Sequence, residues 1–243
     1  MPVARLRPIS PHIAAVDLHG RFQVAAFLVR HRDGLALVDA GFPGWQYAIL
    51  TAARSLPEPN HITHIILTHA HADHIGGASE IAALTGAPIL SSEAERPFIE
   101  GRSLVGSARG VLSAIVLLLN EWFVRRRIPQ TRVCGTLADG DRLCGLRVVS
   151  VPGHSPGQIA LAHDDDGVLL CADAFFNVDG RAGHDPVPGM TWDERVARAS
   201  LARIADLGFR DLVPSHGPAV LGDGPAHIRR FLDSMASSKE REP

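Results

Sequence analysis

Apolar and polar residues follow one another along the first forty positions in a pattern that predicts β-strands. Residues 12–19 (HIAAVDLH), 22–31 (FQVAAFLVRH) and 35–39 (LALVD) are mostly apolar segments separated by glycine or charged turns. Strands so close together in the sequence can pair directly through short turns. We therefore expect an antiparallel meander between His12 and Val38.

Strand-like and helix-like segments alternate through the rest of the chain. In the first half we predict helices at 45–55 and 75–84, and strands at 64–67 and from Pro88. In the second half we predict strands at 146–151, 158–163, 167–173 and 211–214, and helices at 192–207 and 226–235. This repeated order predicts two sheets covered by helices, an α/β layered domain. Because no low-complexity linker separates the halves, we expect one domain over residues 1–243.

Residues 93–128 have a different character, with a helical, apolar and arginine-flanked sequence that includes RGVLSAIVLLLNEWFVRRR. Three interpretations stay open for this insertion: helices that pack on the core, a cap over a substrate cleft, or a homodimer face. Its apolar run, Val111–Val124, is shorter than the ~20 residues of a membrane-spanning helix and contains Asn120 and Glu121. We therefore expect no membrane span.

Composition limits the chemistry and the partners. The formal charge is −2 and the pI about 6.7, so we expect no nucleic-acid partner. Lys239 is the only lysine and lies in the charged C-terminal tail, which argues against Schiff-base chemistry. Three cysteines without a C-x-x-C pair, and no apolar signal segment after the N-terminus, predict a cytoplasmic protein without a disulfide framework.

The sequence THAHADHIGG (68–77) directly follows the predicted strand at 64–67 and concentrates four polar side chains. His69 and His71 are two residues apart, so in an extended segment both imidazoles point to one side. Asp73 and His74 then begin a helix and can turn toward the same point. This spacing predicts a metal site, and its donors suit zinc, iron or manganese. We further expect Gly76 and Gly77 to let the backbone pack close to that site.

Three more candidates each follow a predicted strand: His154 in VPGHSPG, Asp173 in LLCADAFF and His216 in LVPSHGP. Any one of them alone is more simply a turn or capping residue. Together with the first cluster they make seven ligands, enough for two metal ions, and loops at strand ends are where a rigid scaffold displays a site.

With these motifs the chain resembles the metallo-β-lactamase superfamily of metallohydrolases, over nearly its whole length. The segments that carry the resemblance are LALVDAG (35–41), THAHADH (68–74), PGHSPGQ (152–158), CAD (171–173) and SHGP (215–218). The resemblance implies a four-layer αββα sandwich, with the metals at one edge of the two sheets. It also implies that His69, His71 and His154 bind one metal, that Asp73, His74 and His216 bind the other, and that Asp173 bridges them. Asp39 would orient a ligand without binding metal itself.

Two zinc ions per chain, or iron or manganese in their place, could share a hydroxide that attacks a substrate carbonyl. Asp73 would be the catalytic residue that orients this nucleophile and carries its proton. We therefore expect a dinuclear hydrolase of ester, lactone or thioester bonds in a small molecule.

The segment GHSPG (153–157) also matches the G-x-S-x-G elbow of serine hydrolases, and Ser155, Asp173 and His216 follow in the matching order. The residue after such a serine donates its backbone N–H to the oxyanion hole, but here it is Pro156, which has no N–H. The following segment also predicts a strand where the elbow needs a helix. We therefore reject a serine nucleophile and interpret Ser155 as a residue of the turn that aims His154.

The resemblance also ranks the activities. Zinc β-lactamases characteristically lack the bridging aspartate, so Asp173 favours the glyoxalase II-like and lactonase-like branches and makes β-lactam hydrolysis a minor alternative. Glyoxalase II enzymes usually carry a sizeable glutathione-binding region, whereas 27 residues follow His216 here. Acyl-homoserine lactonases place a tyrosine where this chain has Phe176, which we interpret as a substrate contact without the hydroxyl. The alternative outside hydrolysis is a mononuclear iron dioxygenase acting on a persulfide.

Overall fold

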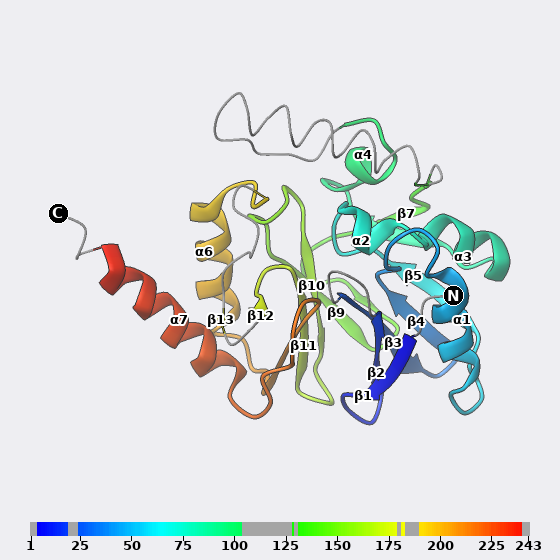
Figure 1. Ribbon diagram of the computed structural model, residues 1–243, viewed down its shortest axis with the longest axis horizontal. Helices are drawn as coiled ribbons and strands as arrows, with labels where there is room; N and C mark the ends of the chain where they lie inside the picture. The colour runs from blue at the N-terminus through cyan, green and yellow to red at the C-terminus, as the bar shows by residue number, and fades with distance from the viewer. Residues whose placement is uncertain are drawn as a thin grey trace.

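A computed structural model describes residues 4–18, 24–103, 128, 131–178, 181–182 and 190–239. Its strands form two large sheets that face each other, with helices on both outer sides (Figure 1). Seven strands form the first sheet in sequence order: β1 (Ala4–Pro8), β2 (Ile13–Leu18), β3 (Val24–His31), β4 (Gly34–Val38), β5 (Ile62–Ile66), β6 (Ile89–Ser92) and β7 (Gly135–Leu137). Strands β1 to β4 pair antiparallel, which confirms the predicted meander, and β4 to β7 pair parallel.

The second sheet has five strands in the order β14-β11-β10-β9-β8. They are β8 (Arg142–Leu143), β9 (Leu146–Ser150), β10 (Ile159–His163), β11 (Val168–Ala172) and β14 (Asp211–Pro214). Strands β11 and β14 pair parallel and the others antiparallel. A small separate hairpin joins β12 (Asn177–Val178) to β13 (Arg181–Ala182).

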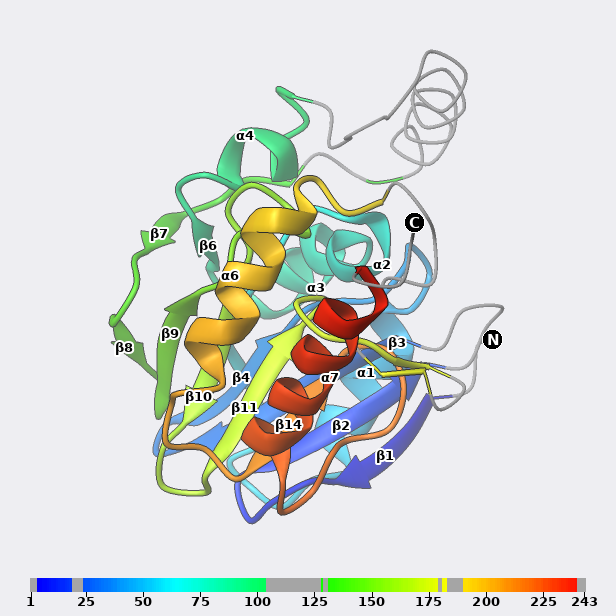
Figure 2. The ribbon, with the colours of Figure 1, turned by 90° about the vertical axis from the view of Figure 1, so that its left-hand side faces the viewer.

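Helices cover the outer face of each sheet. The first sheet packs against α1 (Gln46–Arg54) and α3 (Ala78–Thr85), and the second against α6 (Glu194–Ile204) and α7 (Gly224–Lys239), which lie side by side in Figure 2. Two short helices, α2 (Ala72–Ile75) and α4 (Arg96–Ile99), follow β5 and β6. The expected four-layer αββα sandwich is therefore confirmed.

Alternating side chains on the strands build three apolar layers. On β4, Leu35 and Leu37 face the layer under α1 and α3, whereas Ala36 and Val38 face the layer between the sheets. The third layer lies under α6 and α7 and includes Leu169 and Cys171 of β11. Strands β4, β10 and β11 are buried along their whole length because both faces of each sheet are covered.

The helix predicted at 75–84 is divided in the structure, which corrects that prediction. Helix α2 ends before Gly76 and α3 begins after Gly77. A Cβ at Gly76 would lie 2.3 Å from Cδ of Pro43, and one at Gly77 would lie 2.6 Å from the carbonyl oxygen of Ala40. The glycine pair therefore admits the close approach of residues 40–43, while packing of this backbone against the metal site stays a prediction.

The insertion at 93–128 lies mostly outside the described residues. Its described part contains α4, while residues 104–127 include the whole apolar run and are not described. The prediction of a cap, a dimer face or core packing for this segment thus stays a prediction. Among the helices that the structure describes, none is long and apolar enough to cross a membrane.

The direction of the strands defines two edges of the sandwich. We call the edge at which β4, β5, β9, β11 and β14 finish the carboxyl edge, and the one at which they start the amino edge. Strand β9 belongs to this set because it is antiparallel to β10, which is antiparallel to β11. Residues that directly follow these five strands therefore lie at the carboxyl edge.

Candidate metal centre

The structure brings the seven predicted ligands together at the carboxyl edge. They arrive in four loops: His69, His71, Asp73 and His74 after β5, His154 after β9, Asp173 after β11 and His216 after β14. Their ligand atoms form two groups that could each hold a cation: His69, His71, His154 and Asp173, and then Asp73, His74 and His216. Within each group the atoms lie within 4.8 Å of one another.

In the first group three imidazole nitrogens point at one another. Nδ1 of His71 lies 3.0 Å from Nε2 of His69 and 2.9 Å from Nε2 of His154. Oδ2 of Asp173 completes the group, 3.5 Å from Nε2 of His154 and 3.9 Å from Nε2 of His69. All four side chains are buried, so bulk water cannot satisfy their polar atoms. These atoms therefore need a partner inside the cluster.

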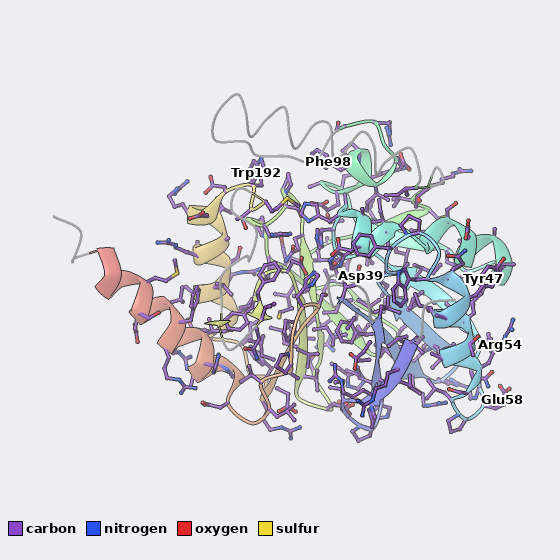
Figure 3. The ribbon with its side chains drawn as sticks, in the orientation of Figure 1. Asp39, Tyr47, Arg54, Glu58, Phe98 and Trp192 are labelled. Carbon is purple, nitrogen blue, oxygen red and sulfur yellow. The ribbon has the colours of Figure 1, made fainter. Side chains whose placement is uncertain are left out.

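Asp39 orients the imidazole of His69 through Thr68. The backbone N–H of Thr68 donates to Oδ1 of Asp39 at 2.9 Å, and the Thr68 hydroxyl donates to Oδ2 at 2.8 Å. With its proton used in this way, Oγ1 of Thr68 accepts from Nδ1 of His69 at 3.1 Å. His69 must then be protonated at Nδ1, which leaves the lone pair of Nε2 directed at His71. Figure 3 places Asp39 in the interior, between the helices that follow β4 and β5 and the sheets.

The same aspartate orients His74. Nδ1 of His74 donates to Oδ2 of Asp39 at 2.8 Å, so the lone pair of its Nε2 faces the cluster. A carboxylate that fixes the tautomer of a metal-binding histidine makes this kind of contact. Asp39 itself adopts a φ of +59°, which is unusual for a residue with a Cβ and turns the chain sharply after β4.

In the second group imidazole nitrogens face carboxylate oxygens. Nε2 of His74 lies 3.4 Å from Oδ1 of Asp173 and 3.7 Å from Oδ2 of Asp73. Neither Nε2 of His74 nor Oδ1 of Asp173 has a hydrogen-bond partner of good geometry among the described residues. Nε2 of His216 lies 3.3 Å from Oδ2 of Asp73 and 3.4 Å from Oδ2 of Asp173. Asp173 thus lies between the two groups, with an oxygen toward each.

The two groups differ in charge. Burial, and then the neighbouring imidazoles, hold the pKa of His69 well below its usual value and lower the pKa of His71 to about 3. In the second group burial opposes ionisation, but the carboxylates outweigh it and raise the pKa of His216 to about 10 and that of His74 well above its usual value. Burial likewise opposes ionisation of Asp73, yet His74 and His216 lower its pKa to about 2. His69 and His71 of the first group are therefore neutral, whereas the second group pairs its carboxylates with protonated imidazoles whose protons a metal cation would replace.

Both groups fit a divalent metal ion. Nitrogens bound about 2.0–2.1 Å from one tetrahedral zinc ion lie about 3.3 Å apart, close to the 2.9–3.0 Å between the nitrogens of the first group. The orphaned Nε2 of His74 and Oδ1 of Asp173 are the buried atoms that a cation in the second group would satisfy. Imidazole and carboxylate donors suit zinc, iron and manganese alike, so the donor set does not choose among them.

Phe176 packs against the rings of two candidate ligands. Its ring lies 5.5 Å from that of His216 in a stacked arrangement and 5.6 Å from that of His154 at 63°. The side chain is 5% exposed, so most of its surface contacts the protein. Its role as a substrate contact stays a prediction, and the observed contacts support the two imidazoles from one side.

Sequence analysis did not single out Glu95, a buried carboxylate that joins two of the ligand loops. Oε2 accepts from the backbone N–H of Ala70, between His69 and His71, at 3.0 Å. Oε1 accepts from the Ser155 hydroxyl at 2.6 Å and from the backbone N–H of Gly157 at 2.7 Å. In sequence, Glu95 is one of several charged residues in SSEAERP, and only its burial separates it from its exposed neighbours.

These contacts also bear on the rejected serine nucleophile. Ser155 is fully buried, and its hydroxyl donates a hydrogen bond to Glu95. The hydroxyl therefore points at this carboxylate and is not exposed to a substrate. The segment that follows is β10, a strand where the elbow needs a helix. Both observations support the rejection.

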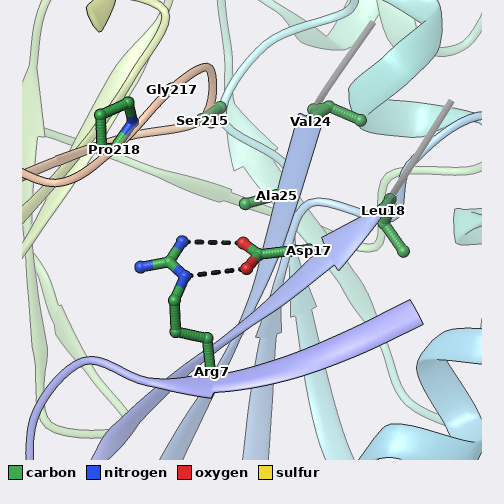
Figure 4. A pocket seen from close by; sticks show the side chains of 8 residues that line it. All are labelled: Arg7, Asp17, Leu18, Val24, Ala25, Ser215, Gly217 and Pro218. Atoms are coloured by element: carbon green, nitrogen blue, oxygen red, sulfur yellow. Dashed lines mark hydrogen bonds and ion pairs between the residues drawn. The ribbon is translucent and has the colours of Figure 1, made fainter. Parts of the chain in front are cut away.

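A cavity of about 260 Å³ lies beside the loop that carries His216 (Figure 4). Ser215, Gly217 and Pro218 line it on one side. On another side Arg7 forms two parallel hydrogen bonds with Asp17, at 2.7 and 2.8 Å. None of the seven candidate ligands lines this cavity, so it adjoins the metal centre through the backbone of residues 215–217 and does not contain it.

An αββα sandwich that gathers histidines and aspartates at the carboxyl edge of its sheets defines a class of metal-dependent hydrolases. The chain belongs to the metallo-beta-lactamase superfamily, whose sequence profile matches residues 19–216. It is 29% identical to the probable metallo-hydrolase YflN of Bacillus subtilis, over 98% of this chain and 96% of that protein.

Two further relatives bear on the activity and on the metal. The chain is 30% identical to a hydroxyacylglutathione hydrolase of Rhodospirillum rubrum, over 74% of this chain and 60% of that protein, so it spans less than two thirds of that relative's length. It is also similar to the crystal structure of TTHA1623 in a di-iron-bound form, with a TM-score of 0.67 and 27% identity, over 89% of this chain and 98% of that one. The family membership supports a metal-dependent hydrolase, and it leaves the metal and the substrate to experiment.

Proposed function

We propose that the chain is a dinuclear metal-dependent hydrolase of ester, lactone or thioester bonds in a small molecule. The observation that carries the proposal is the convergence of five imidazoles and two carboxylates at the carboxyl edge, with Asp173 between the two groups. In the proposed assignment His69, His71 and His154 hold one cation and Asp73, His74 and His216 hold the other, while Asp173 contributes to both. Asp39 and Glu95 hold the loops that carry these ligands.

Bound at these positions, two divalent cations supply a water of lowered pKa and a Lewis acid for the substrate carbonyl. The other parts of the reaction fall to the chain's own residues. Asp73 and His216 are the most exposed members of the cluster, with side chains 19% and 12% exposed against 4% or less for His74, His154 and Asp173. We infer that the substrate approaches from their side.

Asp73 is the proposed acceptor for the proton of the attacking water. Its pKa of about 2 keeps it ionised at neutral pH, and Oδ2 is the oxygen that faces the cluster. A carboxylate in this position can orient the water, take its proton and return it to the leaving oxygen or sulfur. No covalent intermediate on the protein is required, which agrees with the engagement of Ser155 by Glu95.

The substrate class rests on two lines of support. The similarity to a hydroxyacylglutathione hydrolase favours an activated acyl group, and a thioester is the acyl bond that this name describes. Asp173 also favours the glyoxalase II-like and lactonase-like branches of the superfamily, as the resemblance implied. We keep a cytoplasmic location, a single domain over residues 1–243 and the absence of a nucleic-acid partner as predictions, with the three free cysteines as support for a reducing compartment.

The test combines metal analysis with a substrate panel, using protein purified without a histidine tag. We expect two zinc, iron or manganese ions at the carboxyl edge and turnover of an ester, a lactone or a thioester from a panel that also contains a β-lactam. Asp73→Asn should lower kcat about 10²- to 10⁴-fold, since the variant loses the proton acceptor but little volume. Asp206→Asn, at an exposed ion pair with Arg229, is the matched control and should leave kcat unchanged.

Three results would contradict the proposal. Full activity of Asp73→Asn would exclude the assigned role of the carboxylate. One iron per cluster, with oxygen uptake on a persulfide, would favour the dioxygenase alternative. Preference for the β-lactam would favour the zinc β-lactamase alternative, which Asp173 argues against.

A further inference from the structure

A second group of metal-binding side chains lies at the amino edge of the sandwich. His31 is the last residue of β3, His64 lies on β5, and Cys144 lies in the turn between β8 and β9. Each offers one ligand atom, and the three atoms lie within 4.8 Å of one another. The closest contact joins Nδ1 of His64 to Sγ of Cys144 at 3.3 Å. All three side chains are half-buried.

We propose that His31, His64 and Cys144 form a binding site for a thiophilic divalent cation such as Zn²⁺, separate from the centre at the carboxyl edge. One thiolate and two imidazoles are a donor set that zinc prefers, and a fourth position would remain for water. Because the three side chains are half-buried, solvent water can reach that position. This proposal stands on residues that the proposed hydrolase mechanism does not use.

The hydroxyl of Thr63 lies within hydrogen-bond distance of both imidazoles of the group. The hydroxyl of Thr63 donates its single proton to the carbonyl of Leu35 at 3.2 Å. It can accept from Nε2 of His31, which lies 2.8 Å away. Nδ1 of His64 lies 3.1 Å from the same hydroxyl and 3.3 Å from the thiol of Cys144, and a thiol is a weak donor. A cation between these two atoms would replace that weak contact with two strong ones.

A cation that binds this group meets a neutral imidazole and a protonated thiol. Burial, and then the nearby His64, lower the pKa of His31, so its imidazole is neutral at neutral pH. Burial raises the pKa of the Cys144 thiol to about 11, which means that the cation must displace the thiol proton as it binds. The carboxylate of Asp33 acts on both His31 and Cys144 and adds negative charge near the group.

A cation in this group would connect the two sheets. His31 and His64 belong to the seven-stranded sheet, and Cys144 belongs to a turn of the five-stranded sheet. Leu143 and Leu146 pair across that turn, and Cys144 and Gly145 between them adopt φ values of +53° and +78°. Two-residue turns with positive φ at both positions favour asparagine and glycine, so a cysteine at the first position is unusual. The conformation of the turn does not favour a cysteine at position 144. A role for the thiol as a metal ligand would account for it better.

Cobalt distinguishes this group from the carboxyl-edge centre, because only this group contains sulfur. The seven residues at the carboxyl edge are histidines and aspartates, so a thiolate-to-Co²⁺ charge-transfer absorption can arise only where a cysteine binds. We expect metal-free protein titrated with Co²⁺ to develop this absorption. Cys144→Asn should abolish it and lower the Co²⁺ bound by one ion per chain. Asparagine suits the turn, so this variant should fold at least as well as the parent.

Two more variants complete the test. Cys134→Ser, at an exposed cysteine, is the matched control and should retain the absorption. His31→Gln keeps the thiol and should weaken Co²⁺ binding at this group by at least about tenfold. The proposal is overturned if the parent protein shows no charge-transfer absorption, if Cys144→Asn retains it, or if Cys134→Ser loses it. Hydrolysis should be unchanged in Cys144→Asn, so failure here is distinguishable from failure of the proposed function.

Discussion

Histidines beside an aspartate occur at both edges of the sandwich, but their hydrogen bonding differs. At the amino edge Asp166 accepts from the Ser10 hydroxyl at 2.5 Å and from Nδ1 of His12 at 2.8 Å. The ring of His163 stacks on that of His12 at 5.0 Å. Donors there meet acceptors, so the group is complete as a hydrogen-bond network that ties β2 to the turn before β11.

At the carboxyl edge the ring nitrogens and carboxylate oxygens of the same residue types converge on one another. Nε2 of His74 meets a carboxylate oxygen of Asp173 without a hydrogen bond, and Nδ1 of His71 meets two other imidazole nitrogens. Closeness of histidine and aspartate alone therefore does not identify a metal centre. The convergence of several ring nitrogens and carboxylate oxygens on one point does, because such buried atoms need protons or a metal cation between them.

The largest effect that would test this difference is expected at Glu95. In Glu95→Gln one end of the side chain becomes an NH₂ group, which then faces either Ala70 N–H or the two donors Ser155 and Gly157. Two donors would oppose each other in a buried place, at a cost of about 1–3 kcal/mol in unfolding free energy. Because the loops carry ligands, metal affinity should also fall about 10- to 100-fold.

Chelator competition and urea denaturation measure these two effects of Glu95→Gln. Glu93→Gln is the matched control, since Glu93 is 74% exposed two residues away. Equal metal affinity in Glu95→Gln and the parent protein would show that Glu95 does not position the ligands.

A similar loss of affinity is expected at Asp39. In Asp39→Asn the Nδ2 group would face Nδ1–H of His74 if Oδ1 still accepts from Thr68. His74 would then favour the tautomer with its proton on Nε2, which blocks the lone pair that faces the cluster. We expect metal affinity to fall about 10- to 100-fold with little change in fold, as measured by chelator competition. Unchanged affinity would mean that Asp39 does not set the tautomer.

The pH dependence of metal-free protein should reveal the charge difference between the two groups. The folded pKa of His216, about 10, lies above 6.5, so its stabilisation is complete below pH 6.5 and is lost as pH rises toward 10. The folded pKa of His71, about 3, lies below 6.5, so stability is lost as pH falls from 6.5 toward 3. Metal-free protein should therefore be most stable near pH 6.5, with slopes of up to about 1.4 kcal/mol per pH unit for one proton.

Urea denaturation across pH, with a chelator present, measures these slopes. His216→Gln should flatten the alkaline side and His71→Gln the acidic side. If each substitution flattened the other side instead, the assignment of neutral and charged groups would be reversed.

The smallest effect is expected at the amino edge. Asp166→Asn removes a charged acceptor from Ser10 and His12, at a partly exposed place, and should cost about 1 kcal/mol of unfolding free energy. Catalysis and metal content at the carboxyl edge should be unchanged. Asp165→Asn, at the exposed neighbouring position, is the control. A loss of bound metal in Asp166→Asn would contradict our interpretation of this network as purely structural.

Local patterns predicted most of the architecture, and their failures have identifiable causes. The meander, the strands before each ligand and the helices after β4 and β14 follow apolar periodicity, which reports burial directly. Strands β1, β7 and β8 were not predicted. The segment ARLRP of β1 and the short β8 lie at sheet edges, where one-sided pairing imposes little apolar pattern. The division of α2 from α3 depends on the approach of residues 40–43, which no local pattern encodes.

Local sequence was enough to predict the strand ends, the four loops that carry histidine and aspartate, and so the edge at which chemistry was expected. Tertiary structure alone decided which lone pairs converge, that Glu95 joins two ligand loops, and that Cys144 meets His31 and His64. The physical reason is that a ligand motif next to a strand is a local feature. Contacts such as that between His64 and Cys144, 80 positions apart, exist only after two sheets have packed face to face.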